Sequence, residues 1–154
     1  MTHPDQADSS ILELISFEIA SQEFCIDIRA VREIRGWTPA TPLPQTPDYV
    51  QGVINLRGAV IPVVDLRRRL SLGHTEPTSR HVIVVIQHES SVAGLLVDGV
   101  QETFQVSADL MQPPPAVSAT AGDRFVDAIL PLEGRMLSRL VVGSLMQGEL
   151  MEAA

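Results

Sequence analysis

The chain has 154 residues and a formal charge of −8 at pH 7, and 45% of its residues are hydrophobic but only 4% aromatic. This length fits one domain or two very small ones, with a core that must be aliphatic. The negative charge argues against nonspecific binding of nucleic acid or of an anionic lipid surface, because both need clustered cations. Arg67-Arg68-Arg69 is too short to reverse this balance, and we expect it to be the solvated face of one helical turn.

The cysteine content and the N-terminal sequence indicate the cellular compartment in which the protein works. Cys25 is the single cysteine, which excludes an intramolecular disulfide and a cysteine-based zinc site. The first residues are polar and acidic, without the basic and apolar regions of a signal peptide. No apolar run approaches the roughly 20 residues of a membrane span. We therefore expect a cytoplasmic protein in which residues 1–11 form a disordered tail.

Alternating apolar and polar residues predict a first hairpin over residues 14–28. Phe24 and Ile26 fall on its apolar face and Cys25 on its polar face. We expect Cys25 to be an incidental thiol, because no histidine lies near it in the sequence to activate it. Residues 30–36 then predict a helical turn that continues as a strand.

A proline-rich connector precedes the most informative part of the chain. Residues 38–47 contain four prolines and cannot form a helix or a central strand. Two β-rich runs, residues 52–56 and 59–66, follow and meet at Arg57-Gly58. A glycine there supplies the positive φ of a tight turn and leaves Arg57 on a rigid support. This arrangement suits recognition better than catalysis, because no base, nucleophile or metal ligand accompanies the arginine.

The second half of the chain predicts more short strands. The polar residues 74–80 are the best candidate for a boundary between two halves. We expect strands at residues 81–86, 92–97, 100–106, 125–132 and 135–142, a loop at 110–122 and a short helix at 145–151. Turns spaced by about 8–12 residues are typical of barrels and sandwiches. Two small barrels with a shared seam fit the length, because one barrel of five short strands would use only half of it.

Patterns that signal catalysis or metal binding are missing from the sequence. Phosphate-binding glycine loops are absent, and the four histidines form no His-x-x-x-His pair. We expect surface histidines, no metal and no cofactor. Asp65 and Asp98 invite comparison with the carboxylate pair of a hydrolase, but each follows an apolar run and begins a turn. Aspartate at such positions satisfies backbone donors, so we expect no enzymatic activity.

Residues 44–66 carry a long motif, Pro-x-x-Pro-x-Tyr-Val-x-Gly-Val-Ile-Asn-Leu-Arg-Gly-x-Val-Ile-Pro-Val-Val-Asp-Leu. It closely resembles the signature of the CheW family of bacterial chemotaxis coupling proteins. Residues 24–28, 30–36 and 97–100 are also similar to that family. The resemblance spans residues 13–147.

The resemblance implies an all-β fold of two intertwined five-stranded SH3-like β-barrels, with short helical turns and a short C-terminal helix. It implies one CheW-like domain over residues 12–148, with the barrel boundary near 74–80, and a C-terminal tail at 149–154. It also implies a non-catalytic adaptor that couples the cytoplasmic tips of chemoreceptors to the regulatory domain of a chemotaxis histidine kinase. Such an adaptor is recruited from the cytoplasm to membrane-bound receptor arrays and binds no nucleic acid.

The same resemblance implies the binding residues. The expected receptor-binding residues are Val31, Glu33, Asn55, Leu56, Arg57 and Gly58. The kinase-facing surface of the family lies mainly on the other barrel, which we place at residues 81–106, and the candidates there are Val84, Val92 and Leu96. Two alternatives remain: a homologous scaffold of a pathway that controls pili or a second messenger, and a small barrel that binds oligonucleotides or catalyses a reaction. The charge and the few stacking aromatics argue against the second alternative.

Overall fold

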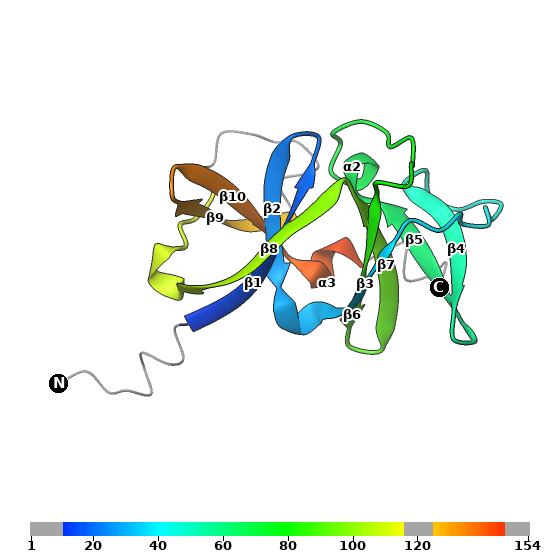
Figure 1. Cartoon of the computed structure of the whole chain (residues 1–154), viewed down its shortest axis with the longest axis horizontal. Helices are drawn as coiled ribbons and strands as arrows, with labels where there is room; N and C mark the ends of the chain where they lie inside the picture. Colours follow the sequence, from blue (N-terminus) through cyan, green and yellow to red (C-terminus); the bar gives the residue numbers. More distant parts are fainter. Residues whose placement is uncertain (1–10, 116–124, 147–154) are drawn as a thin grey trace.

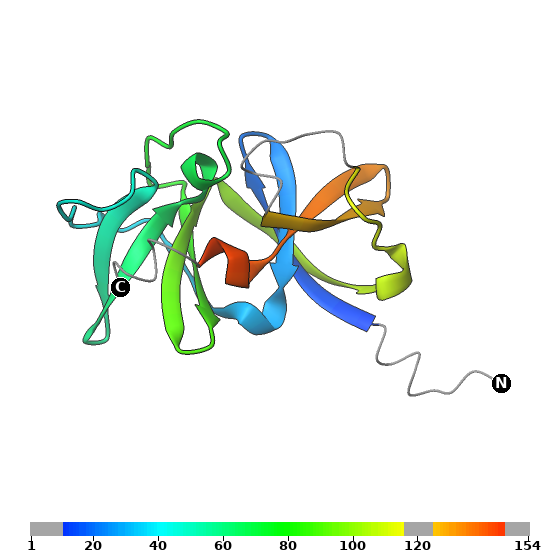
Figure 2. The ribbon, with the colours of Figure 1, turned by 180° about the vertical axis from the view of Figure 1, so that it is seen from behind.

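Two five-stranded β-sheets make up the computed structural model, which describes residues 11–115 and 125–146. The first sheet, in the order β8-β1-β2-β10-β9, contains β1 (Ile11–Ile19), β2 (Gln22–Asp27), β8 (Gly99–Ser107), β9 (Val126–Leu132) and β10 (Arg135–Leu140). The second sheet, in the order β3-β6-β7-β5-β4, contains β3 (Val31–Gly36), β4 (Val50–Leu56), β5 (Ala59–Asp65), β6 (Val82–His88) and β7 (Ser91–Val97). Each sheet curls on itself, and the two lie side by side (Figure 1; Figure 2). The predicted all-β fold of two intertwined five-stranded barrels is confirmed, and we call these sheets the first and the second barrel.

The described residues contain four short helical segments: η1 (Ile28–Ala30), α2 (Leu66–Arg69) and η2 (Ala108–Leu110) lie between strands, and α3 (Val142–Leu145) follows the last strand. The last of them begins earlier than predicted, at Val142. Residues 147–151 of the predicted helix lie outside the described residues. So do residues 1–10 of the predicted N-terminal tail, the tail at 149–154 and residues 116–122 of the predicted loop.

The two barrels share one strand pattern. In each sheet, successive neighbours pair antiparallel, antiparallel, parallel and antiparallel from one edge to the other. The parallel contact joins a strand of one hairpin to a strand of the next. The architecture is therefore repeated, although the sequence shows no repeat at a fixed period.

Within residues 11–115 and 125–146, the chain crosses between the barrels twice. It leaves the first barrel through η1, after β2, and returns at Asp98, between β7 and β8. The predicted boundary near residues 74–80 is therefore wrong. This polar segment joins α2 to β6, and the strands before and after it, β5 and β6, both belong to the second sheet. A loop within one barrel has the same composition as a linker, so composition alone cannot separate the two.

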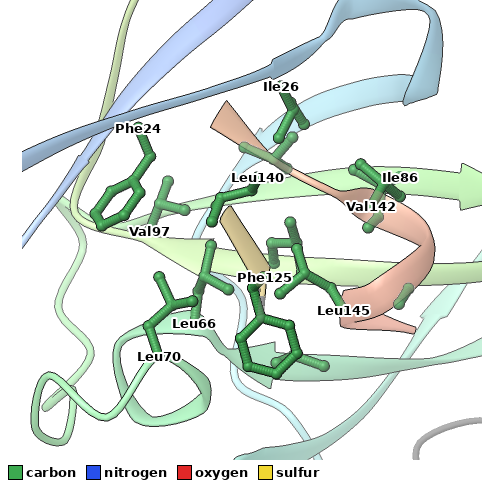
Figure 3. Close-up of a cluster of buried hydrophobic side chains, with 14 of the residues drawn as sticks. Phe24, Ile26, Leu66, Leu70, Ile86, Val97, Phe125, Leu140, Val142 and Leu145 are labelled. Atoms are coloured by element: carbon green, nitrogen blue, oxygen red, sulfur yellow. The ribbon is translucent and has the colours of Figure 1, made fainter. Parts of the chain in front are cut away.

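Mostly aliphatic side chains from both barrels, together with a few aromatic ones, meet in a shared core (Figure 3). Phe24 and Ile26 of β2 lie in one cluster with Ile86 of β6 and Val97 of β7. Two smaller clusters fill the barrels themselves, one around Ile83 in the second barrel and the other in the first. Burial of each such side chain is worth about 1.5–3 kcal/mol, so the shared core holds the barrels together.

Cys25 lies inside the first barrel. The alternation of the sequence had instead predicted a position on the polar face of the hairpin. Both faces of β2 are buried: Phe24 and Ile26 face the shared core, whereas Cys25 joins Leu14 and Leu137 inside the barrel. A strand that is covered on both faces no longer needs polar residues at alternate positions. The predicted face of Cys25 was wrong for this reason.

Burial raises the pKa of the Cys25 thiol from 9.0 to about 12. The unfolded chain releases this proton at lower pH than the folded chain. Between pH 9 and 12 we therefore expect the free energy of unfolding to fall by up to about 1.4 kcal/mol per pH unit. Denaturant titrations on either side of pH 9 measure this fall. The variant Cys25→Ala should lose it, and an equal fall in both proteins would contradict the assignment to Cys25.

Candidate functional site

The turn between β4 and β5 presents Arg57 at the surface. Arg57 and Gly58 have φ angles of 52° and 90°, the left-handed pair of a type I′ turn, whose twist matches that of the flanking strands. The Gly58 N–H donates a hydrogen bond of 2.9 Å to Oδ1 of Asn55. Asn55 and Gly58 therefore shape the turn, while the side chain of Arg57 is 71% exposed and projects from it.

Arg57 forms an ion pair with Glu33 of β3 across one end of the second barrel. Nη2 of Arg57 donates to Oε1 of Glu33, and Nη1 of Arg35 lies 3.4 Å from Oε2 of the same carboxylate. Because β3 and β4 are the two edge strands of the second sheet, this contact connects the edges that the curled sheet brings together. Exposed ion pairs contribute little to stability, so the guanidinium of Arg57 remains available to a partner's carboxylate.

The hydrogen bond from Arg57 holds the pKa of Glu33 below its ordinary value, and the same pair raises the pKa of Arg57. The contribution of the pair to stability is therefore present above the ordinary pKa of glutamate and is lost as the pH falls through the lowered value. In Arg57→Ala we expect the pKa of Glu33 to rise, as followed by an NMR titration of its carboxyl carbon. Arg32→Ala is the matched control, because Arg32 donates to Gln87 instead. An unchanged pKa of Glu33 in Arg57→Ala would show that the pair does not form in solution.

An open pocket of ≈ 250 Å³ lies beside this ion pair. It is lined by Arg32, Glu33, Leu56, Arg57, Ala59, Ile61, Val85 and Val92. Its buried members are aliphatic, namely Leu56, Ile61 and Val85, whereas its charged members are more accessible to solvent. Such a pocket suits an apolar side chain of a partner whose neighbouring charges meet the rim.

The structure brings part of the predicted receptor-binding set together. Glu33, Leu56 and Arg57 line the pocket, and Leu56 is buried there. Asn55 forms the turn beside them. Val31 lies apart from the pocket lining, since its half-buried side chain packs against the shared core.

The predicted kinase-binding residues are placed differently from the expectation. Val84 and Leu96 are each only 1% exposed, the first in the shared core and the second inside the second barrel. Neither side chain is accessible to a partner, so that prediction was wrong for both. Val92 is half-buried and lines the pocket next to Arg57. All three residues lie on β6 and β7, in the same barrel as Arg57 and not in the other one.

The sequence interpretation missed pocket residues that lie on strands other than β4. Ile61 is paired with Ile54 and shares a face with Ala59, so alternation along the second run could have identified it. Val85 pairs with Glu33 between β6 and β3. Such a contact between distant segments leaves no signal in the local sequence.

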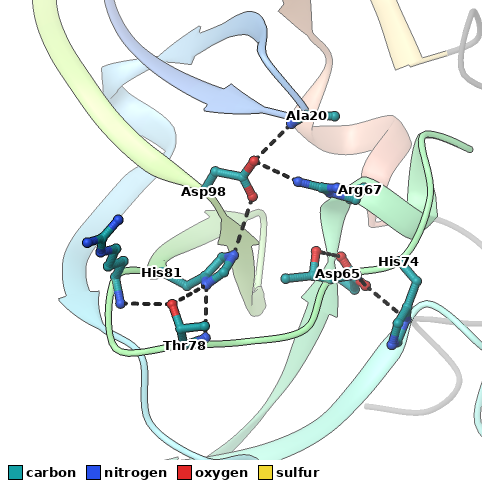
Figure 4. Close-up of polar contacts among 9 residues, drawn as sticks. Ala20, Asp65, Arg67, His74, Thr78, His81 and Asp98 are labelled. Carbon is teal, nitrogen blue, oxygen red and sulfur yellow. Dashed lines mark hydrogen bonds and ion pairs between the residues drawn. The ribbon is translucent and has the colours of Figure 1, made fainter.

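Asp65 and Asp98 hold backbone groups, as the sequence predicted (Figure 4). The Asp65 carboxylate accepts hydrogen bonds from the backbone N–H and the hydroxyl of Thr75, at 2.9 and 2.6 Å. Oδ2 of Asp98 accepts one from the backbone N–H of Ala20 at 2.9 Å. Both carboxylates therefore have structural partners.

Residues 11–115 and 125–146 contain neither a metal-binding cluster nor a membrane-spanning helix. No three His, Cys, Asp or Glu side chains gather there in a way that could hold a metal ion. No helix within the same residues has the length and the apolar character needed to cross a bilayer.

The comparisons with known proteins agree with this geometry. A family model described as a CheW-like domain matches residues 13–149. The "Chemotaxis protein CheW" of Rhizobium meliloti (strain 1021) is 51% identical over 142 residues, which are 92% of each chain. The "Chemotaxis protein CheW" of Bacillus subtilis (strain 168) is 30% identical over 142 residues, 92% of this chain and 91% of the relative. A crystal structure of the scaffolding protein TtCheW from Thermoanaerobacter tengcongensis matches with a TM-score of 0.82 at 29% identity, covering 90% of this chain and 94% of that one. The chain therefore belongs to the CheW-like family of chemotaxis coupling adaptors.

Proposed function

We propose that this chain is a non-catalytic adaptor that couples the cytoplasmic tips of chemoreceptors to a chemotaxis histidine kinase. The observation that carries the proposal is an exposed arginine, Arg57, held on a rigid turn beside an apolar pocket in a protein of this family. Relatives that are named chemotaxis proteins favour this pathway over one that controls pili or a second messenger. Recruitment to membrane-bound receptor arrays follows from receptor binding.

In this proposal the receptor tip presents a helical surface to the second barrel. Arg57 pairs with a carboxylate on a receptor helix, either in place of its ion pair with Glu33 or in addition to it. An apolar side chain three or four residues away on the same helix face enters the pocket, where Leu56 forms part of the floor. Asn55 and Gly58 hold the turn, and Val31 supports β3 from the shared core.

The kinase regulatory domain then contacts mainly the first barrel. Large apolar side chains are exposed on that barrel at Ile11, Leu110 and Met136, and partners commonly cover exposed apolar groups. Val92 is assigned to the receptor pocket, since it lines the same surface as Arg57.

Sedimentation with receptor-containing membranes tests the proposal. We expect the kinase to sediment with these membranes only when the chain is added. The chain alone should sediment with the receptor, and it should bind the isolated kinase regulatory domain in solution. Loss of either pairwise interaction would overturn the bridging role.

A further inference from the structure

The helix α2 follows β5 of the second barrel, and its three arginines reach three different places. Nη2 of Arg67 lies 2.8 Å from Oδ2 of Asp98, and Nη2 of Arg69 donates to the carbonyl oxygen of Leu145 at 3.3 Å. Nε of Arg68 lies 3.3 Å from Asp48, which precedes β4 in the same barrel. The predicted solvated face of one helical turn is therefore wrong for Arg67 and Arg69.

Asp98 joins groups from both barrels at the point where the chain returns to the first one (Figure 4). From the first barrel, the Asp98 carboxylate accepts a hydrogen bond from the backbone N–H of Ala20, in the β1–β2 turn. From the second barrel, Oδ2 of Asp98 accepts a hydrogen bond from Nη2 of Arg67, and Nε2 of His81 lies 3.5 Å from Oδ1. His81, predicted to be a surface residue, has a side chain that is only 16% exposed. One largely buried carboxylate thus ties α2 to the first barrel.

Arg69 makes a second connection between the barrels. Its guanidinium carbon lies 4.1 Å from the ring centre of Tyr49, which precedes β4, and 4.7 Å from that of Phe125, which precedes β9. A guanidinium over an aromatic face is attracted by the ring quadrupole, more strongly where water is excluded. The same side chain donates to Leu145 of α3. Arg69 therefore links an aromatic residue of each barrel and the last described helix.

The shared core and these arginines act differently on the two barrels. Apolar burial opposes their separation but is not directional. Charge-assisted hydrogen bonds fix distance and angle as well. We propose that Arg67 and Arg69 are positioning residues, which hold the two barrels in one relative orientation and thereby transmit the receptor state to the kinase. The signalling part of this inference rests on the proposed function, whereas the part about orientation does not.

Spin labels on the two barrels measure the orientation. Val60 of β5 and Met136 of β10 are 66% and 64% exposed, so Val60→Cys and Met136→Cys give accessible labelling sites in the full chain. The native Cys25 is buried and its raised pKa keeps the thiol protonated, so it should not react. We expect Arg67→Gln with Arg69→Gln to shift or broaden the distance distribution between the labels.

Arg68→Gln is the matched control, because it removes one arginine from the same helix without touching a contact between the barrels. It should leave the distribution unchanged, and Arg67→Lys should largely restore it where Arg67→Gln alters it. If the double variant does not fold, Arg67→Gln alone decides the question, since it removes only the contact with Asp98. A wild-type distribution in a folded variant, or the same change in Arg68→Gln, would overturn the inference.

A second readout separates transmission from binding. In a reconstituted receptor–kinase complex, we expect Arg67→Gln to lower kinase activation by about three- to tenfold. The affinities for receptor and for kinase, measured separately, should remain at wild-type values. A variant that is merely unstable would lose affinity for both. Failure of wild-type protein to bind either partner would refute the proposed function, while the label distances would still decide on the orientation. Activation at the wild-type level in a variant with altered distances would refute the transmission step.

Discussion

Reversing the charge of Arg57 is expected to weaken receptor binding by more than an order of magnitude while the fold remains intact. Arg57→Glu removes the cation from the pocket rim and places a second carboxylate beside Glu33. Arginines are frequent among binding hot spots, and the reversed charge also repels a receptor carboxylate, so we expect the affinity for receptor-containing membranes to fall by about thirtyfold or more. Circular dichroism and thermal unfolding should change little, because the side chain is largely exposed. Co-sedimentation with receptor membranes measures the loss.

A double charge swap distinguishes a contact with the receptor from a structural role. Glu33→Arg combined with Arg57→Glu restores an ion pair of reversed polarity across the end of the second barrel. We expect this variant to stay defective, because a receptor carboxylate then meets a glutamate at the turn. Recovery of receptor binding would instead mean that Arg57 acts by closing the barrel. Arg29→Glu controls for the change in net charge, since Arg29 is exposed on η1 and lies outside the pocket lining.

The Arg57 turn could be predicted because its signals are local. Two apolar runs that meet at a residue followed by glycine predict a tight hairpin turn, and the structure has it, with both Arg57 and Gly58 at positive φ. The position of Glu33 beside Arg57 depends instead on the curling of a sheet in which β3 and β4 are opposite edges. No spacing in the sequence reports that contact, and the family resemblance implied only that both residues belong to the receptor-binding set.

The intertwined path of the chain was predicted as an architecture but not in its details. A polar stretch at residues 74–80 looked like the natural division, yet the crossings occur at η1 and at Asp98. Neither crossing differs in composition from an ordinary turn. Because of this misplaced boundary, β6 and β7 were assigned to the wrong barrel, and the kinase-facing surface was expected there.

Alternation of apolar and polar residues does not identify the exposed side chains of strands that are buried on both faces. β6 and β7 read as continuous apolar runs, so the sequence offered no means to decide which of their residues reach the surface. Val84 and Leu96 turned out to be buried on opposite faces, in the shared core and inside the second barrel. The prediction that the arginines of α2 face water was wrong for a related reason. The acceptors of Arg67 and Arg69 lie at Asp98 and Leu145, far along the chain, and a local run of like charges normally faces water.

Among the glycines in the described part of the chain, Gly52 is the one where an added methyl group is expected to damage the fold most. It has a φ of 149° and lies at an irregularity in the pairing of β4 with β5. A Cβ at this position would lie 2.4 Å from the carbonyl oxygen of Thr41 and 2.6 Å from its carbonyl carbon. This backbone is itself fixed, because Thr41 and Val53 exchange two hydrogen bonds of 2.8 and 2.9 Å. A backbone carbonyl in a paired segment cannot rotate away as a flexible side chain would.

Gly52→Ala is therefore expected to lower the free energy of unfolding by about 3 kcal/mol, as judged from other changes that combine a steric clash with backbone strain. For a domain of this size, the midpoint of thermal unfolding should fall by about 10 °C. Gly36→Ala, at the end of β3, is the matched control, because no atom lies within 4 Å of its Cβ position. Equal, small effects at both positions would show that the segment around Thr41 is not held against β4 in solution. Because β4 also carries the Arg57 turn, receptor affinity measured on the folded fraction of Gly52→Ala tests whether the pairing with Thr41 helps to hold that turn in place.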